Sequence, residues 1–284
     1  MRPHLLVCDL DNTLYDWVGF FVPSFYAMVD KAIAILGCDR DLLLDDLKEV
    51  HQRYHDSEHP FALLETNTVQ RLLGTLEIRE QRQILDPAFK AFNTMRKQTL
   101  RLYPGVELAL EQFQRAGIKL VAHSESRLYA VMFRLRFLSL THFFERIYCI
   151  ERPTRTLADE EQTRASWSDF PMSKLVELSH DRRKPSPEVL AEIFWNFDVP
   201  ADNAAYVGDS IAKDIYMAKQ AGSHSIWAEY GSRHAPEEYA KLVRVSHWTP
   251  EEIEYEEMLR KLAKDVRPDF TARESFSELL DYLN

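Results

Sequence analysis

Two aspartates separated by a single residue stand directly after an apolar run near the start of the chain. The run covers residues 5–8, and Asp9 and Asp11 follow it. Such a run predicts a buried strand, and the ligands of a parallel α/β sheet bind beyond the carboxyl ends of its strands. Two carboxylates so close repel each other unless a cation neutralises them or one of them holds a proton. Mg²⁺ together with a phosphate ester would satisfy that requirement.

Other reactive side chains follow later apolar runs or lie in the loops after them. Ser124 and Asp209 each follow such a run, Lys184 lies in a loop, and Asp214 stands five positions after Asp209. In isolation, such an Asp or Ser is usually a turn residue or a helix cap, and such a Lys is usually solvated. At average residue frequencies, Asp-x-Asp-x-Thr is expected by chance in roughly one chain of this length in 30, and Gly-Asp-Ser-x-x-x-Asp is several-fold rarer. Because both strings occur here in order, one shared site is favoured.

Short apolar runs alternate with helical patterns in the second part of the chain. Predicted strands cover 118–123, 147–150, 203–207 and 225–227, and predicted helices include 106–116, 126–138 and 211–221. Alternation at this spacing predicts an α/β fold, with a doubly wound, Rossmann-like parallel sheet and helices on its faces. A last amphipathic helix is expected at 275–282.

Helical patterns without any strand pattern separate the first strand from this alternating region. The first predicted helix ends near Gly37, and the next three cover 39–55, 61–73 and 87–97. A group of this kind indicates a helical module inserted into another domain. We therefore predict an α/β core of residues 1–15 and 100–284 and an α-helical cap domain of residues 16–99.

Composition narrows the class of protein. The 284 residues include 35 Lys and Arg and 45 Asp and Glu, and the net charge of -10 argues against binding to a nucleic acid polymer or an anionic membrane. Three cysteines, an odd number, fit reduced thiols better than a disulfide framework. No unbroken apolar run approaches the roughly 20 residues that span a membrane, and the run before Asp9 is too short for a signal peptide. We therefore expect a cytoplasmic protein that acts on a small molecule.

The motifs resemble those of the haloacid dehalogenase-like superfamily, and specifically its phosphatases with a helical cap. The residues that carry the resemblance are Asp9 to Thr13, Ser124 after its strand, Lys184-Pro185, and Gly208 to Asp214. The order of strands and helices between them is also similar, and Phe270 to Leu283 resembles the family's last strand and helix. The resemblance implies Mg²⁺-dependent hydrolysis of a small phosphate monoester.

The resemblance assigns different roles to the two aspartates of the first motif. Asp9 would be the nucleophile that attacks phosphorus and forms an aspartyl-phosphate. Asp11 would protonate the leaving alcohol and then deprotonate the water that hydrolyses the intermediate. Thr13 would be a supporting residue. Dehalogenases and phosphonatases of the superfamily lack an acid at the position of Asp11, so its presence favours phosphate-ester hydrolysis or phosphoryl transfer.

The resemblance also implies how the metal and the phosphate are held. The ligands of Mg²⁺ would be Asp9, the backbone carbonyl of Asp11, and Asp209, because this ion prefers oxygen. Asp214 would support them from behind or through water. Ser124 and Lys184 would bind the phosphoryl oxygens, and Lys184 would also offset the crowded acids.

Some features depart from the family's pattern. Glu125 stands where an Asn is common, and an acid beside a phosphate is unfavourable unless it points away or is paired. Ser126 is an alternative phosphate ligand. The segments 152–169 and 234–264 are insertions whose roles the sequence leaves open.

The cap also contains basic residues that could meet an anionic substrate, although most of them are expected to be ordinary surface residues. They are His51, Arg53, His55, His59 and Arg71.

Other functions are compatible with some of these residues. A phosphomutase would use the same side chains but would shield the aspartyl-phosphate from water. A catalytically silent binding or regulatory protein could share the fold, although it would have no reason to keep Asp11. An Asp-x-Asp pair also binds metal in glycosyltransferases, but that function leaves Lys184 and residues 208–214 unexplained.

Overall fold

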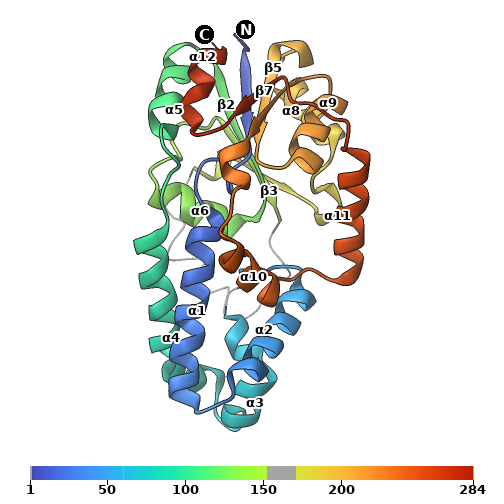
Figure 1. The fold of residues 1–284 in the computed structure, drawn as a ribbon. Helices are drawn as coiled ribbons and strands as arrows, with labels where there is room; N and C mark the ends of the chain where they lie inside the picture. Colours follow the sequence, from blue (N-terminus) through green and yellow to red (C-terminus); the bar gives the residue numbers. More distant parts are fainter. Residues whose placement is uncertain (1, 60, 152–170, 284) are drawn as a thin grey trace.

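A parallel sheet with helices on both faces forms one end of the molecule, and further helices extend from it (Figure 1). The computed structural model describes residues 2–59, 61–151 and 171–283. Within them, seven strands pair in parallel in the order β4-β3-β2-β1-β5-β6-β7. The strands are β1 (Leu5–Cys8), β2 (Lys119–Arg127), β3 (Arg146–Ile150), β4 (Leu175–Leu178), β5 (Ala204–Gly208), β6 (His224–Ala228) and β7 (Phe270–Ala272). The predicted α/β class with a parallel sheet is confirmed.

Helices cover the sheet in two layers. Helices α5 (Val106–Arg115), α6 (Leu128–Phe137) and α12 (Leu279–Leu283) lie on one face, and α8 (Pro187–Asn196) and α9 (Tyr216–Gln220) lie on the other. In β1, Leu6 and Cys8 belong to the first buried cluster, while Leu5 and Val7 belong to the second. Because successive side chains of a strand point to opposite faces, this alternation accounts for the doubly wound arrangement.

The order of the strands reverses beside β1. The chain passes from β1 to β2, β3 and β4 on one side, and then returns to place β5 on the other side of β1. In sheets of this kind, ligands bind in the crevice beyond the carboxyl ends of the strands at such a reversal. The ends of β1 and β5 therefore mark the place for a site.

Two strands differ from the prediction. The edge strand β4 was not predicted, because it has only four residues and the last of them, Leu178, is the buried one. The predicted strand 118–123 is too short, since β2 continues to Arg127. Its polar last residues pair with β3 across a shift in register between His123 and Arg127, which the sequence does not indicate. The insertion predicted at 152–169 lies outside the described residues.

Helices α1 to α4 form the end of the molecule away from the sheet (Figure 1). They are α1 (Trp17–Leu36), α2 (Arg40–Tyr54), α3 (Asn67–Leu73) and α4 (Ile78–Thr99). The fourth predicted helix, 87–97, is too short because Pro87 lies inside α4 rather than at its start. Because proline has no N–H, Pro87 cannot donate a helical hydrogen bond to the carbonyl of Gln83, four residues earlier. Gln83 is an exposed residue. The third predicted helix is divided at Thr66, whose hydroxyl accepts a hydrogen bond from the Val69 amide.

Among the described residues, α1 is the helix whose length and composition would suffice to cross a membrane. Half of its most apolar window is buried inside the protein. Asp30 and Lys31 interrupt its apolar sequence. The helix packs against α4 and α10 (Pro236–Val245), so packing within the protein accounts for its apolar side chains.

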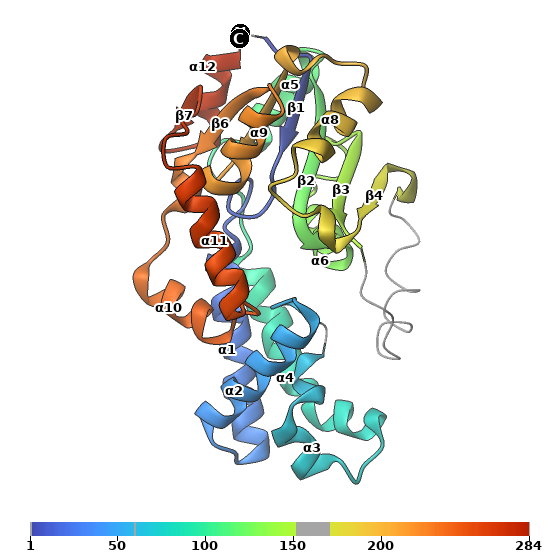
Figure 2. The same cartoon turned by 90° about the vertical axis from the view of Figure 1, so that its right-hand side faces the viewer.

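Residues 234–264, which we call the strap, connect the two ends of the molecule along one side (Figure 2). The strap contains α10 and α11 (Pro250–Leu262). Its helix α10 packs against α1 and α2, where the buried His51 donates from Nδ1 to the carbonyl of Val245 at 2.6 Å. Its helix α11 packs against the sheet end, with Leu259 and Ala263 in one buried cluster with Ala212. One insertion that the sequence left without a role thus joins the helical end to the sheet.

The connections between the two ends lie side by side, since Tyr15 and Leu102 form an antiparallel bridge. The division into a core of 1–15 and 100–284 and a cap of 16–99 stays a prediction. The strap shows that α10, although it belongs to the predicted core in sequence, has much of its packing with the predicted cap.

The contact between His51 and Val245 predicts how stability changes with pH. Burial lowers the pKa of His51 from 6.5 to about 4, although the hydrogen bond to Val245 opposes this change. In the unfolded chain His51 therefore binds a proton as the pH falls below 6.5, whereas in the folded protein it stays neutral until about pH 4. This contribution to stability is complete above pH 6.5 and is lost as the pH falls toward 4.

We expect the free energy of unfolding to fall by about 2 kcal/mol more for the wild type than for His51→Gln when the pH changes from about 7 to about 5. Urea denaturation of both proteins at the two pH values measures this difference. Equal losses in the two proteins would show that His51 is not the group responsible.

Candidate active site

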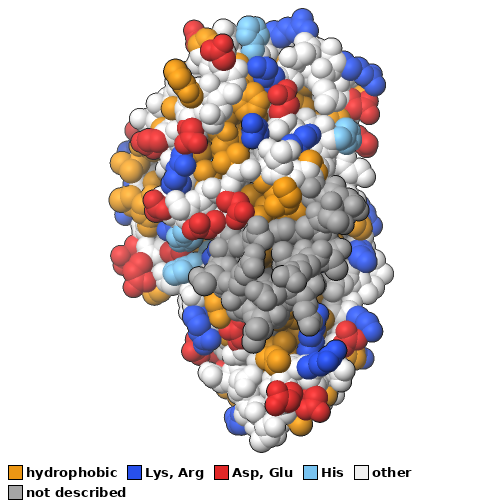
Figure 3. Space-filling view, turned by 180° about the vertical axis from the view of Figure 1, so that it is seen from behind, with side chains coloured by type: hydrophobic (Ala, Val, Ile, Leu, Met, Phe, Trp, Pro, Cys, Tyr) orange, Lys and Arg blue, Asp and Glu red, His pale blue; other side chains and the backbone are white. Residues whose placement is uncertain are grey.

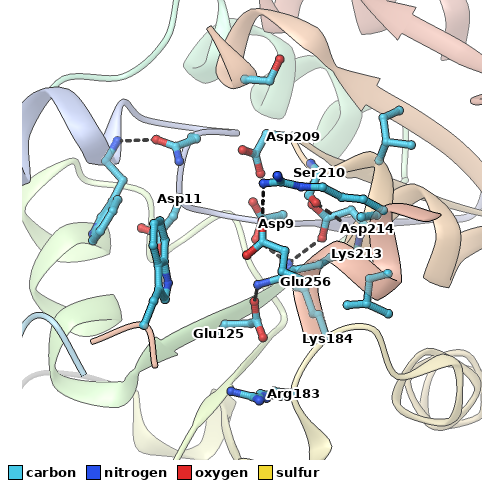
Figure 4. Close-up of a pocket in the computed structure, with 18 of the residues that line it drawn as sticks. Asp9, Asp11, Glu125, Arg183, Lys184, Asp209, Ser210, Lys213, Asp214 and Glu256 are labelled. Carbon is cyan, nitrogen blue, oxygen red and sulfur yellow. Dashed lines mark hydrogen bonds and ion pairs between the residues drawn. The ribbon is translucent and has the colours of Figure 1, made fainter. Parts of the chain in front are cut away.

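Three aspartates converge beyond the carboxyl ends of the adjacent strands β1 and β5. Asp9 directly follows β1, Asp209 directly follows β5, and Asp214 lies on the π-helical turn η5 (Ile211–Ile215) that comes next. One carboxylate oxygen of each lies within 4.8 Å of the others. Figure 4 shows the three side chains grouped in the cleft. The strand order thus brings together acids that are 200 residues apart in the chain.

A buried lysine links two of these aspartates. Lys184 is 3% exposed, and its Nζ donates to Oδ1 of Asp9 at 2.5 Å and to Oδ1 of Asp214 at 2.9 Å. The hydroxyl of Tyr206 donates to the same oxygen of Asp214 at 3.3 Å. Lys184 therefore places its positive charge among the acids, as the sequence analysis expected.

Burial and mutual repulsion change the acidity of the cluster. Burial raises the pKa of Asp9 to about 7, although Lys184 acts in the opposite direction. Asp214 and Asp11 add to that rise. The pKa of Asp209 is raised well above its ordinary value by burial and then by Asp9 and Asp214. Burial alone would lower the pKa of Lys184, but Asp214 and Asp9 raise it well above its ordinary value. One lysine thus faces more acid than it neutralises.

The donor atoms of this cluster suit a hard divalent cation. All three side chains offer carboxylate oxygens, which are the ligands that Mg²⁺ prefers. Asp9 and Asp209, both predicted as ligands, belong to the group. Asp214, predicted as a supporting residue, belongs to it as well. Within the described part of the chain, the side chain of Asp11 is not in this group, and the contact of a metal with its backbone carbonyl stays a prediction.

Two glycines allow the site to be this compact. A Cβ on Gly208 would lie 2.4 Å from the carboxylate of Asp214, and a Cβ on Gly231 would lie 1.6 Å from the carbonyl oxygen of Asn12. Both distances are too short for atoms that are not bonded. Position 208 therefore requires glycine for a steric reason, because any side chain there would displace Asp214.

Asp11 contacts a different set of groups. Its Oδ1 accepts a hydrogen bond from Nη1 of Arg134 at 2.5 Å. Its Oδ2 accepts hydrogen bonds from the hydroxyls of Ser126 at 2.6 Å and Ser124 at 3.3 Å. Arg134 also pairs with Glu58, which lies in the predicted cap. The two aspartates of the first motif are therefore held by two separate cations, Lys184 for Asp9 and Arg134 for Asp11.

Sequence reasoning missed Arg134 and Glu58. Arg134 lies on α6 between buried apolar residues that include Val131 and Leu135, and it is only 1% exposed. An arginine on the apolar side of a helix has to find an acid, because an unpaired charge is costly to bury. The place of Arg134 among apolar residues could therefore have indicated a buried ion pair, but it does not identify the acid that Arg134 contacts.

The predicted phosphate ligands are arranged differently from one another. Ser124 is 1% exposed and, among the described residues, is absent from the lining of the cleft, whereas Ser126 lines it. Thr13 donates from its hydroxyl to Oδ2 of Asp9 at 2.8 Å, which orients that carboxylate.

Glu125, the departure from the family's pattern, pairs with Lys213 at 2.9 Å. Its charge is therefore compensated, as an acid at this position requires.

A cleft of about 1270 Å³ opens beside the acidic cluster. Its lining includes residues of the sheet end, of the loop after α2, and of the strap, among them Asp9, Lys184, His55, Glu58, His247 and Glu252. Among the basic cap residues singled out in the sequence, the lining includes His55. Two others have acidic partners, since His59 pairs with Glu65, and Arg53 with the same Glu65 and with Glu49. The cleft thus receives side chains from both ends of the molecule.

Known proteins are similar to this chain in sequence. The family model of the haloacid dehalogenase-like hydrolases matches residues 3–222. Curated relatives include glyceraldehyde 3-phosphate phosphatases of Pyrococcus abyssi, 24% identical over 225 residues, and of Pyrococcus furiosus, 24% identical over 231 residues. The first match covers 78% of this chain and 80% of the relative, and the second covers 81% and 82%.

Solved structures of low sequence identity share the fold. A 2-haloacid dehalogenase of Pseudomonas syringae pv. Tomato has a TM-score of 0.56 at 22% identity, and the match covers 100% of this chain and 98% of that one. A HAD phosphatase of Thermococcus onnurineus has a TM-score of 0.55 at 17% identity, with the same coverage.

The position of Lys184 predicts a large effect on stability. Lys184→Met would leave Asp9 and Asp214 buried without their partner, so we expect a loss of about 3–5 kcal/mol in the free energy of unfolding. Chemical denaturation in a buffer with a metal chelator measures it. Lys219→Met is the matched control, because its ion pair with Asp269 is about one-third exposed and should contribute less than about 1 kcal/mol. Similar losses in the two variants would contradict the proposed arrangement.

Proposed function

Because the chain belongs to the haloacid dehalogenase-like hydrolase family, we propose that it hydrolyses a small-molecule phosphate monoester with Mg²⁺ and an aspartyl-phosphate on Asp9. The observation that carries this proposal is the convergence of Asp9, Asp209 and Asp214 on one spot, with Lys184 between two of them. The phosphatase relatives support the same reaction type. The chain is a hydrolase of phosphate esters, and its partner is a small phosphorylated molecule.

In the first step an oxygen of Asp9 forms a bond to phosphorus while the bond from phosphorus to the ester oxygen breaks. Asp11 gives its proton to the departing alkoxide, which leaves as an alcohol. In the second step water attacks phosphorus, Asp11 takes the proton of that water, and Asp9 is released together with inorganic phosphate. Asp9 attacks in its ionised form, which needs no base to activate it and which the ammonium of Lys184 favours.

Positive charge around the phosphoryl group supplies most of the remaining rate enhancement. A bound Mg²⁺ would be held by Asp9, Asp209 and the backbone carbonyl of Asp11, with Asp214 close by, and would neutralise charge on the phosphoryl oxygens. Lys184 would bind one of those oxygens and keep Asp9 oriented. Ser124 or Ser126 would donate a further hydrogen bond, and Ser126 has the advantage that it lines the cleft.

The contacts of Asp11 place a condition on this mechanism. Both of its carboxylate oxygens already accept hydrogen bonds from Arg134, Ser126 and Ser124. Asp11 therefore has to exchange at least one of these contacts for the ester oxygen.

In the proposal, residues 16–99 act as the cap over the cleft and residues 1–15 and 100–284 as the catalytic core. Glu58, which shares Arg134 with Asp11, makes the position of the cap relevant to this exchange.

Removal of the nucleophile tests the proposal directly. We expect Asp9→Asn to lower kcat for phosphate esters by at least about 1000-fold, because an amide does not form the intermediate. A chelator should abolish wild-type activity, and added Mg²⁺ should restore it. Release of inorganic phosphate across a panel of esters measures both effects. Asp202→Asn, on a turn outside the cleft, is the matched control. Undiminished hydrolysis by Asp9→Asn would exclude this mechanism.

The role of Asp11 predicts a dependence on the leaving group. Asp11→Asn should slow the hydrolysis of an alkyl phosphate by about 100-fold or more, because an alkoxide needs a proton to leave. Formation of the intermediate from an aryl phosphate, whose phenolate leaves more easily, should be affected less. Single-turnover measurements with both esters separate the two cases. An equal reduction in this step for both esters would show that Asp11 does not protonate the leaving group.

A further inference from the structure

Basic side chains gather on the wall of the cleft next to Lys184. His55 lies at the end of α2, and His180 and Arg183 lie on the turn after β4, with the ring centroids of the two histidines 5.5 Å apart. On the face seen from behind, histidine side chains gather about midway between the two ends of the molecule (Figure 3). Burial lowers the pKa of His180, and Arg183, His55 and Arg127 lower it further. These basic groups therefore face one region of space.

We propose that Arg183, His55 and His180 form a second anion-binding subsite, which selects phosphate esters that carry another anionic group such as a carboxylate. This inference rests on the proposed phosphatase function. Neither the acidic cluster nor Lys184 distinguishes such an ester from one without the second anionic group, so Arg183, His55 and His180 would determine specificity.

A carboxylate already occupies one side of this region. Oε1 of Glu252, on α11 of the strap, lies 3.2 Å from Nη1 of Arg183 and 3.4 Å from Nδ1 of His55. Its Oε2 accepts a hydrogen bond from the amide of Thr249 at 3.1 Å and so completes the cap of that helix. Glu252 is thereby fixed, and it shows that a carboxylate oxygen fits between Arg183 and His55.

Arg183 has capacity for a second acceptor. A guanidinium has five N–H groups in a planar arrangement that matches a carboxylate. Among the described residues, its side chain has one hydrogen bond, the one to Glu252, and it is one-third exposed. Its remaining N–H groups are available to an anion in the cleft.

The neighbouring acids do not cancel this capacity. Asp56 accepts a hydrogen bond from the hydroxyl of Tyr129 at 2.5 Å and pairs with Arg127 at 3.4 Å. Glu252 is shared between Arg183 and His55. Both acids thus already have partners, and the N–H groups of Arg183 that do not contact Glu252 can still donate to an anion in the cleft.

The subsite lies in the same cleft as Asp9. Arg183 directly precedes Lys184, so their Cα atoms are about 3.8 Å apart, and both side chains line the same cleft. In the view of Figure 4, Arg183 lies beyond Lys184 and Glu125 as seen from Asp9. A substrate whose phosphate is held at Asp9 and Lys184 would therefore bind in the cleft that Arg183 also lines.

The strap is necessary for this arrangement. It holds Glu252 against Arg183, and the loop between its helices places His247 beside Ser57 of the helical end, with 2.9 Å between Nδ1 and Oγ. The subsite therefore combines the helical end, the sheet end and the strap, which gives the insertion 234–264 a role in substrate selection.

Matched substrates provide the test. Phosphoglycolate and ethyl phosphate form one pair, and 3-phosphoglycerate and glycerol 3-phosphate form another, and in each pair only one ester carries a carboxylate. We expect wild-type kcat/KM to favour the carboxylate in at least one pair by about 10-fold or more. Arg183→Gln should remove that preference mainly through KM, and kcat/KM for the ester without a carboxylate should stay within about twofold of the wild-type value.

Arg182→Gln is the matched control, because Arg182 stands on the same turn but pairs with Glu192 of α8 at 2.5 Å and does not line the cleft. It should leave both pairs unchanged. If Arg183→Gln fails to fold, His55→Asn serves instead, since Asn tolerates the left-handed backbone found there, and a threefold or greater loss specific to the carboxylate is expected.

Two results would overturn the inference. One is a wild-type protein that hydrolyses all esters without preference for the carboxylate, and the other is an equal loss for both members of a pair in Arg183→Gln. In either case the phosphatase function stands. The absence of hydrolysis of every ester in the presence of Mg²⁺ would instead overturn the proposed function, and the subsite with it.

Discussion

The interaction on which the site depends is the one between the buried ammonium of Lys184 and the carboxylates of Asp9 and Asp214. Carboxylates crowded in a region of low dielectric repel one another, and burial alone makes each charge costly. The lysine reduces that cost and holds the ends of β1 and β5 in a fixed relation. The strand order and the close approach at Gly208 then follow as requirements for three acids to share one spot. Because positive charge is still in deficit, the same geometry prepares the site for a divalent cation.

A second cation separates the functions of the two neighbouring aspartates. Asp9 forms an ion pair with Lys184, while Asp11 forms an ion pair with Arg134 and accepts hydrogen bonds from two serine hydroxyls. The repulsion expected between acids two residues apart is thus relieved by giving each its own partner. Since Arg134 also pairs with Glu58, the helical end of the molecule reaches the acid that the proposed mechanism needs for proton transfer.

The strap explains how one cleft can be formed from both ends of the molecule. Its helix α10 rests on α1 and α2, and its helix α11 rests on the turn that carries Asp214. Glu252 and His247 therefore reach a wall that neither end would complete alone. The proposed chemistry at the strand ends and the proposed selection at the cleft wall are in this way assigned to different segments of the chain.

The sequence by itself determined the α/β class, the ends of β1 and β5, and the helical character of residues 16–99, while the resemblance to a family indicated that the acids and Lys184 belong to one site. These follow from local apolar periods and from motifs a few residues long, which encode short-range geometry. Only the tertiary structure decided which distant groups meet. Arg134 contacts Asp11 across 123 residues, and His51 contacts Val245 across 194. The end of β2 was missed for the same reason, because its polar residues become strand only through pairing with β3, and the short edge strand β4 is likewise recognised only by its pairing with β3. Which residues come into contact across such long sequence separations depends on how the whole chain packs, and a local sequence pattern does not contain that information.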